Sequence, residues 1–140
     1  AGTPLTLTDP AMTRFWLTLL EAVAFALHAL DTMEGGEIFV PILPSLRLGD
    51  LAEAVAPGHA LAVTGRRPGG EKDHETLLNA EEARRTVEVN GWYVTPPAIQ
   101  SWSAPPLRGR PLAADFCYRS DRNPWRLTVE EMRAMLKAIP

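Results

Sequence analysis

Short apolar stretches separated by turn residues run along the chain, and the first of them has the period of a strand. Polar and apolar side chains alternate over residues 4–8, which is typical of a strand with one buried face. The Asp9-Pro10 pair ends this stretch, because proline disfavours helical backbone in the residue before it. We therefore expect a short strand followed by a loop near the start of the chain.

The longest apolar pattern predicts a helix that begins after Thr18. Thr18 and Glu21 have the spacing of a capping box, in which each side chain bonds the backbone N–H of the other residue. Large apolar residues then recur every three or four positions until Gly35-Gly36, a pair that readily ends a helix. The expected apolar face consists of Leu20, Val23, Leu27 and Leu30, widened by Phe25 and Ala26.

The middle of the chain alternates between strand and helix patterns. Prolines and glycines separate these patterns, since both residue types interrupt regular structure. In chain order we predict a strand over 38–40, a short helix over 51–56, a strand over 60–64, and a loop over 65–75 that leads into a helical turn over 75–78.

Asn90-Gly91 is a strong signal for a tight hairpin, because both residues tolerate the positive φ that a two-residue turn requires. We expect strands on either side of it, over 86–89 and 92–95, after a charged surface stretch at 81–85. Prolines then interrupt residues 96–111, which we predict to be a loop.

A second capping box marks the last helix of the chain. Thr128 and Glu131 have the required spacing, and Met132, Met135 and Leu136 lie on the predicted apolar side. The pattern therefore indicates a helix that begins after Thr128.

The order of these elements predicts a mixed α/β (α+β) fold with short strands and about three to four helices. We expect one domain over residues 1–140, which includes the proline-rich loop at 96–111. Hydrophobic residues make up 46% of the chain, which is enough apolar material for a core of its own.

Charge and composition exclude several classes of function. The formal net charge of −3 opposes a nucleic-acid partner held through its phosphates. No apolar run reaches about 18 residues and no signal-peptide pattern opens the chain, so we expect neither a membrane span nor a leader.

Cys117 is the only cysteine, so no disulfide can form within the chain, which fits a cytoplasmic protein. The first residue is alanine, which fits a piece of a longer protein or a processed start.

Two polar segments carry the candidate chemistry. Residues 12–16 read Met-Thr-Arg-Phe-Trp, which by itself is typical of a loop entering a helix, with core aromatics and a solvated arginine. Residues 67–75 read Arg-Pro-Gly-Gly-Glu-Lys-Asp-His-Glu, which by itself is typical of an exposed, charged turn. The proline of this second segment restricts the backbone and its glycines permit positive φ, so it can curl around a ligand.

The sequence lacks the patterns of metal and nucleophile sites. His28, His59 and His74 are scattered without His-x-x-x-His spacing, so we expect no metal site. No Gly-x-Ser-x-Gly elbow is present either. An unrelated small enzyme that uses Asp73, His74 and Glu75 is the weakest of the alternatives.

Four segments together carry a resemblance to a known family. They are residues 8–16 (Thr-Asp-Pro-Ala-Met-Thr-Arg-Phe-Trp), 35–41 (Gly-Gly-Glu-Ile-Phe-Val-Pro), 67–75, and 116–125 (Phe-Cys-Tyr-Arg-Ser-Asp-Arg-Asn-Pro-Trp). With them the chain resembles the C-terminal part of bacterial UDP-N-acetylglucosamine 4,6-dehydratases of the inverting type. These enzymes are extended short-chain dehydrogenases/reductases that make precursors of surface and flagellar glycans. Gly70 is additional to the family pattern, Asp73 replaces an apolar residue, and Ile42 replaces a common lysine.

The resemblance implies a small substrate-binding domain without a Rossmann domain. The whole enzyme would use NADP, which takes a hydride from C4 of the sugar and returns it at C6 after water leaves across C5–C6, with inversion at C5. This chain has no Gly-x-x-Gly-x-x-Gly turn for the cofactor pyrophosphate. It also has no Tyr-x-x-x-Lys pair, because Pro97 and Arg122 stand four positions after Tyr93 and Tyr118. We therefore expect no cofactor and no catalytic residue in this chain.

The resemblance also implies a set of substrate-binding residues. They are Met12, Thr13, Arg14, Arg67 and Glu71. Arg14 would help to hold the nucleotide, and Arg67 would offer a planar fork to the diphosphate. Glu71 would accept a hydrogen bond from the ribose hydroxyls.

The function that follows is a UDP-sugar-binding C-terminal domain of a UDP-N-acetylglucosamine 4,6-dehydratase, inactive alone and cytoplasmic. Its expected partners are the UDP-sugar substrate and the N-terminal cofactor domain that precedes it in the family. Apolar surface left open without that domain would also favour a homo-oligomer. The alternative is a stand-alone, non-catalytic binding or interaction module derived from the same domain.

Overall fold

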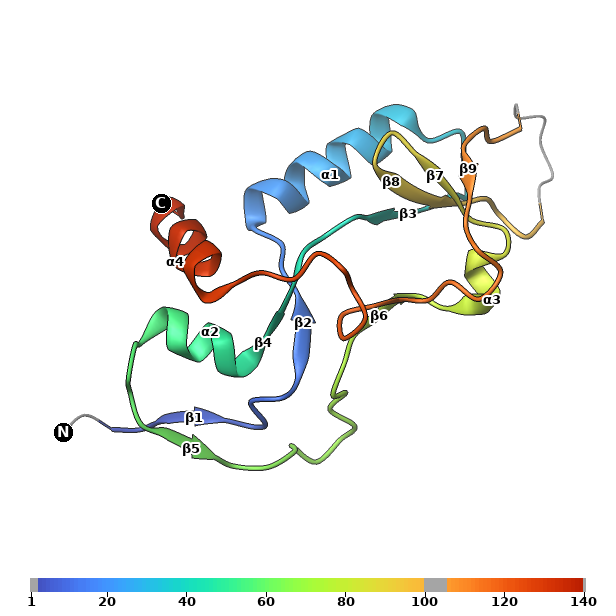
Figure 1. Ribbon diagram of the computed structural model, residues 1–140. Helices are drawn as coiled ribbons and strands as arrows, with labels where there is room; N and C mark the ends of the chain where they lie inside the picture. Colours follow the sequence, from blue (N-terminus) through green and yellow to red (C-terminus); the bar gives the residue numbers. More distant parts are fainter. Residues whose placement is uncertain (1–2, 100–105, 140) are drawn as a thin grey trace. The chain divides into compact units, whose positions relative to one another are not determined.

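The computed structural model describes residues 3–99 and 106–139 (Figure 1). The chain forms two compact units, each built from segments that are distant in the sequence. Unit 1 comprises Ala1–Trp16, Pro44–Glu75 and Arg119–Pro140, and unit 2 comprises Leu17–Leu43 and Thr76–Tyr118. The expectation of one domain over residues 1–140 stays a prediction.

Unit 1 contains two pairs of short strands. β1 (Leu5–Leu7) runs parallel to β5 (Leu61–Val63), and the two lie side by side in Figure 1. β2 (Thr13–Phe15) runs antiparallel to β4 (Ser45–Arg47). The strands predicted over 4–8 and 60–64 are therefore confirmed, whereas β2 lies where a loop was expected.

Two helices pack together at the core of unit 1. α2 (Leu48–Val55) follows β4 directly, and α4 (Val129–Ala138) packs against it. The capping box predicted for α4 is present: the Thr128 N–H donates to the Glu131 carboxylate at 2.8 Å, and the Glu131 N–H donates to Thr128 Oγ1 at 3.2 Å. The buried core residues are Leu46, Ala54, Leu127 and Met132.

Unit 2 is built on a four-stranded antiparallel sheet in the order β3-β8-β7-β9. Its strands are β3 (Ile38–Pro41), β7 (Val87–Val89), β8 (Trp92–Thr95) and β9 (Arg110–Pro111). Asn90 and Gly91 have φ values of 51° and 84°, as a two-residue hairpin turn requires. The predicted hairpin is confirmed.

α1 (Leu19–Thr32) lies along this sheet with only a narrow contact (Figure 1). The rings of Phe25 and His28 lie 5.0 and 5.2 Å from the ring of Trp92. The capping box of Thr18 and Glu21 is confirmed. However, none of the helix residues is buried, and the predicted apolar face is exposed: Leu20 72%, Val23 49%, Leu27 62%, Leu30 67%. The helix therefore presents an open apolar stripe, and the expected homo-oligomer stays a prediction.

The other face of the sheet carries an aromatic cluster. Tyr93 follows Trp92 in β8 and so points to the opposite side, where its ring lies 5.4 Å from Phe116 and 5.2 Å from Tyr118. The Tyr118 hydroxyl donates to the Leu43 carbonyl at 2.9 Å. Burial raises the pKa of Tyr118 to about 12.

The remaining elements correct three local predictions. Residues expected to form a helical turn over 75–78 instead form strand β6 (Thr76–Leu78), because so short a run has no period that separates strand from helix. The charged stretch at 81–85 begins in helix α3 (Ala80–Ala83), whose N-cap is Asn79. The loop predicted over 96–111 ends in β9, and its residues 100–105 lie outside the described residues.

Counted over the described residues, α1 to α4 make four helices, so the mixed α/β class with short strands is confirmed. β10 (Tyr118–Arg119) completes the elements. In the described part of the chain, no helix is both long and apolar enough to span a membrane.

Truncating the fully buried Met132 should destabilise the protein strongly. Met132→Ala leaves a cavity in the α2–α4 core, so the free energy of unfolding should fall by about 2–5 kcal/mol. Met33→Ala makes the same chemical change at a side chain that is 48% exposed, and should alter stability by about 0.5 kcal/mol or less. Denaturant unfolding of both variants measures the difference, and equal losses would contradict the assignment of the core.

Candidate functional site

The structure brings Arg14 and Arg67 to one cleft in unit 1. Arg14 comes from β2 and Arg67 from the loop after β5, and the cleft between them has a volume of about 530 Å³. Its lining residues are Thr6, Leu7, Thr8, Arg14, Leu48, Thr64, Arg67 and Glu71. Three of the five predicted substrate-binding residues therefore line the same cleft.

Glu71 is the acceptor on which both arginines converge. Its Oε1 accepts from Arg67 NH2 at 3.0 Å and lies 3.7 Å from Arg14 NH2. The Arg67 backbone N–H donates to Oε2 at 3.1 Å, and Thr8 Oγ1 donates to Oε1 at 3.4 Å. The Glu71 side chain is only 9% exposed. These donors, the Arg67 guanidinium first, lower the pKa of Glu71 to about 2.

Arg14 is held by backbone carbonyls as well as by carboxylates. Its NH1 donates to the Thr13 carbonyl at 2.8 Å and to the Asp73 carbonyl at 3.2 Å. Its NH2 lies 3.6 Å from the sulfur of Met12, and its Nε lies 3.9 Å from the Glu75 carboxylate. The Arg14 side chain is 23% exposed, so the guanidinium is fixed at the cleft rather than solvated as the residue pattern alone suggests.

Met12 and Thr13 do not line the cleft. They are 1% and 3% exposed, so they lie beneath Arg14 as buried support. The structure thus gives both residues a place next to the candidate site, while direct contact with a substrate stays a prediction.

The additional glycine of the 67–75 segment has a defined backbone role. Gly69 and Gly70 have φ values of 107° and 88°, which other residues rarely adopt, although a Cβ at either position would have open space around it. The two glycines are therefore required by backbone conformation and not by crowding, and they let the chain turn so that Arg67 and Glu71 pair. Asp73 forms an ion pair with Arg66, so its charge is neutralised locally.

His74 takes part in a hydrogen-bond cluster. Its Nδ1 lies 2.9 Å from Thr13 Oγ1, and Thr13 Oγ1 lies 2.6 Å from Ser120 Oγ. Among residues 3–99 and 106–139, no group of three or more His, Cys, Asp or Glu side chains could hold a metal ion.

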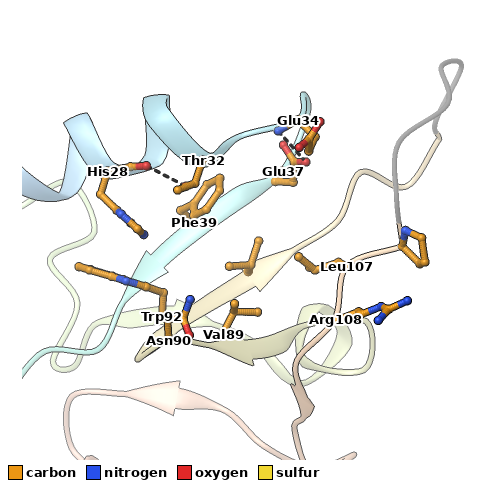
Figure 2. Close-up of a pocket in the computed structure, with 12 residues that line it drawn as sticks. His28, Thr32, Glu34, Glu37, Phe39, Val89, Asn90, Trp92, Leu107 and Arg108 are labelled. Carbon is orange, nitrogen blue, oxygen red and sulfur yellow. Dashed lines mark hydrogen bonds between the residues drawn. The ribbon is translucent and has the colours of Figure 1, made fainter.

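Unit 2 contains a second cavity, of about 440 Å³, that holds none of the predicted site residues (Figure 2). Figure 2 shows Trp92, Phe39 and Leu107 around its apolar part, with His28 near Trp92 and Arg108 beside Leu107. Its walls come from α1, the turn that follows it, the sheet with its hairpin turn, and residues 106–108. Glu37 and Phe39 belong to the motif at residues 35–41, but that motif alone indicates no cavity.

Sequence reasoning also missed cleft residues outside the two motifs. Thr8, Leu48 and Thr64 line the cleft, but each lies next to a strand or in a helix whose pattern indicates only structure. Thr8 and Thr64 are brought together by the parallel pairing of β1 with β5, where the Thr64 backbone N–H donates to the Leu7 carbonyl at 2.9 Å, whereas Leu48 is the first residue of α2.

A family model described as polysaccharide biosynthesis protein matches residues 1–97. The chain belongs to this family.

Two UDP-N-acetylglucosamine 4,6-dehydratases (inverting) from strains of Campylobacter jejuni are 36% and 35% identical to this chain over 136 residues. The match covers 91% of the chain and 40% of each dehydratase, in its C-terminal part. A UDP-glucose 4-epimerase of Rickettsia typhi is 33% identical over 99 residues, which cover 68% of the chain and 29% of the epimerase. The resemblance drawn from the four motifs is confirmed, and the chain spans about 40% of the length of the dehydratases.

The fold is similar to that of a solved structure as well. Pen from Bacillus thuringiensis superposes with a TM-score of 0.81 at 26% sequence identity. The superposition covers 96% of this chain and 40% of Pen.

Removing Arg67 should raise the pKa of Glu71 from about 2 toward its usual 4.5, because the Arg67 guanidinium is the main cause of the shift. The folded pKa is lowered, so the stabilisation from this pairing is present above about pH 4.5 and is lost as the pH falls through about 2. Carbon-13 NMR titration of the Glu71 carboxyl in the wild type and in Arg67→Ala measures the change.

Arg84→Ala is the matched control for that titration. Arg84 is similarly exposed but pairs with Glu81, so its removal should leave the Glu71 titration unchanged. The assignment is wrong if Arg67→Ala and Arg84→Ala give the same titration curve for Glu71.

Proposed function

We propose that this chain is the UDP-sugar-binding C-terminal part of a UDP-N-acetylglucosamine 4,6-dehydratase. The enzyme would act in the biosynthesis of surface polysaccharide or flagellar glycan precursors. The family membership and the names of the relatives support this proposal, since both the dehydratases and the epimerase are named for UDP sugars.

One observation carries the proposal: two arginines distant in the sequence line one cleft. A guanidinium has a planar set of donors that matches phosphate oxygens, so two of them suit a diphosphate. Arg14 and Arg67 face the carboxylate of Glu71, Arg14 also lies 3.9 Å from the Glu75 carboxylate, and the Arg66–Asp73 pair is neutral. The charges of these ion pairs balance, so the attraction for an anionic nucleotide sugar would come from guanidinium N–H donors that bind phosphate oxygens and not from a net positive charge.

Glu71 would act mainly by orienting the two arginines. Arg67 uses NH2 and its backbone N–H for Glu71, so other donors of its guanidinium remain to bind phosphate oxygens. The carboxylate can accept several hydrogen bonds at once, so a contact with a ribose hydroxyl is compatible with this arrangement. Glu71 would therefore also accept a hydrogen bond from a ribose hydroxyl of the ligand.

NADP would be held by residues outside this sequence. Neither a glycine-rich pyrophosphate turn nor a Tyr-x-x-x-Lys pair occurs in the 140 residues, so these residues do not fit the cofactor. The hydride transfers are therefore assigned to no residue of this chain. What the chain would contribute is substrate binding and orientation.

Substituting either arginine should weaken UDP binding. Hydrogen bonds to charged groups contribute about 1.5–3 kcal/mol each, so Arg14→Ala and Arg67→Ala should each raise the Kd of UDP about tenfold or more. Isothermal titration of the 140-residue chain with UDP measures this. Arg84→Ala, which removes an exposed arginine of unit 2, is the control and should leave the Kd unchanged. A wild-type chain that does not bind UDP would overturn the proposal.

The same chain should not bind NADP. Calorimetric titration with NADP should give no saturable heat below roughly millimolar cofactor, because the chain lacks the turn that cradles the pyrophosphate. Saturable binding at micromolar NADP would show that the division of roles between this chain and the rest of the enzyme is wrong.

A further inference from the structure

Three sequence motifs meet at one buried point in unit 1. Thr13 from residues 12–16, His74 from residues 67–75 and Ser120 from residues 116–125 form a hydrogen-bonded cluster. Thr13 Oγ1 lies 2.6 Å from Ser120 Oγ and 2.9 Å from His74 Nδ1. Thr13 is 3% exposed and Ser120 is fully buried. A set of polar side chains buried to this degree is costly unless every member is hydrogen-bonded.

All three side chains can be hydrogen-bonded in two different arrangements of the hydroxyl and imidazole protons. In both, Ser120 Oγ accepts from the Glu75 N–H at 2.9 Å. Ser120 can donate to Thr13 Oγ1 while Thr13 donates to His74 Nδ1. Alternatively, His74 donates to Thr13, Thr13 donates to Ser120, and Ser120 donates to the Thr13 carbonyl at 3.2 Å. The cluster therefore stays bonded for either tautomer of the imidazole.

The two backbone carbonyls that accept hydrogen bonds from Arg14 are also bonded to Ser120 or Thr13. The Thr13 carbonyl accepts from Arg14 NH1 at 2.8 Å and from Ser120 Oγ at 3.2 Å. The Asp73 carbonyl accepts from the Thr13 N–H at 3.0 Å and from Arg14 NH1 at 3.2 Å. Arg14 NH1 is thus held by two carbonyls, and the backbone that carries them is bonded in turn by Ser120 Oγ and by the Thr13 N–H.

Ser120 and the Thr13 hydroxyl are buried and do not line the cleft, so they act on a ligand only through another residue. We propose that Ser120 and Thr13, bonded to His74, are positioning residues that hold the Arg14 guanidinium in the cleft for the diphosphate. This inference rests on the proposed function. It assigns a role in ligand binding to residues 116–125, whose sequence pattern alone indicates no such role.

A double-mutant cycle on the 140-residue chain, with UDP as the probe, tests the inference. Ser120→Ala should raise the Kd of UDP about fivefold or more in the wild type but less than about twofold in an Arg14→Ala background, because its effect passes through Arg14. In an Arg67→Ala background Ser120→Ala should keep its full effect. An effect that persists undiminished without Arg14, or no effect at all, would overturn the inference.

A pair of substitutions at Thr13 separates the hydroxyl from packing. Thr13→Val keeps the shape and removes the hydroxyl, so it should weaken UDP binding as Ser120→Ala does. Thr13→Ser keeps the hydroxyl, so its Kd should stay close to that of the wild type. A general loss of packing would instead lower the melting temperature without this pattern of Kd values, and that result would also overturn the inference.

A ligand-free measurement separates this inference from the proposed function. The Nη1–H resonances of Arg14, the group that donates to the two carbonyls, should be resolved in the wild type and broadened by exchange in Ser120→Ala, since the backbone that carries these carbonyls is then held less firmly. If UDP does not bind the wild type, the proposed function fails, and the Arg14 resonance still decides the positioning role. Equal Arg14 signals in the two proteins would reject that role.

Discussion

The extended backbone of residues 12–15 is the feature on which the rest of unit 1 depends. On one side, β2 pairs with β4, and the Leu48 N–H donates to the Met12 carbonyl at 2.9 Å. On the other side, the Thr13 N–H donates to the Asp73 carbonyl at 3.0 Å and the Phe15 N–H to the Glu75 carboxylate at 2.7 Å. One short strand therefore joins the helical core to the charged loop.

This arrangement explains how an exposed loop can present a defined charge pattern. An arginine in a mobile loop loses much side-chain entropy when it binds a ligand. Here Arg14 is fixed by backbone carbonyls, and Arg67 is tied to Glu71 by both its side chain and its backbone N–H. Much of the ordering is thus present before any ligand arrives, and such preorganisation favours binding.

Elements with local signals could be predicted from the sequence, and elements with distant partners could not. The capping boxes at Thr18 and Thr128 and the Asn90-Gly91 turn depend on residues within a few positions, and all three are present. β2 takes its strand conformation from β4, far along the chain, so its own five-residue motif looked like a loop. The signal for α3 was local, in the spacing of Asn79 and its capping partner, and was overlooked.

In the candidate site too, residues within local motifs could be predicted and residues placed by distant pairing could not. The motifs identified Arg14, Arg67 and Glu71, but the cleft also needs Thr8 and Thr64, which only the pairing of β1 with β5 brings there. Likewise, helical periodicity predicted α1 and a packing face centred on its leucines, but the ring contacts with the sheet are made by Phe25 and His28, while the leucine stripe is exposed. These features depend on contacts between residues that are far apart in the sequence, and no short window of sequence contains such contacts.

NMR chemical-shift perturbation of the 140-residue chain by UDP would locate the bound nucleotide. The shifts should concentrate at the cleft of unit 1, on Arg14, Thr64 and Arg67. Shifts that instead concentrate on Trp92 and Arg108, at the cavity of unit 2, would contradict the proposed site.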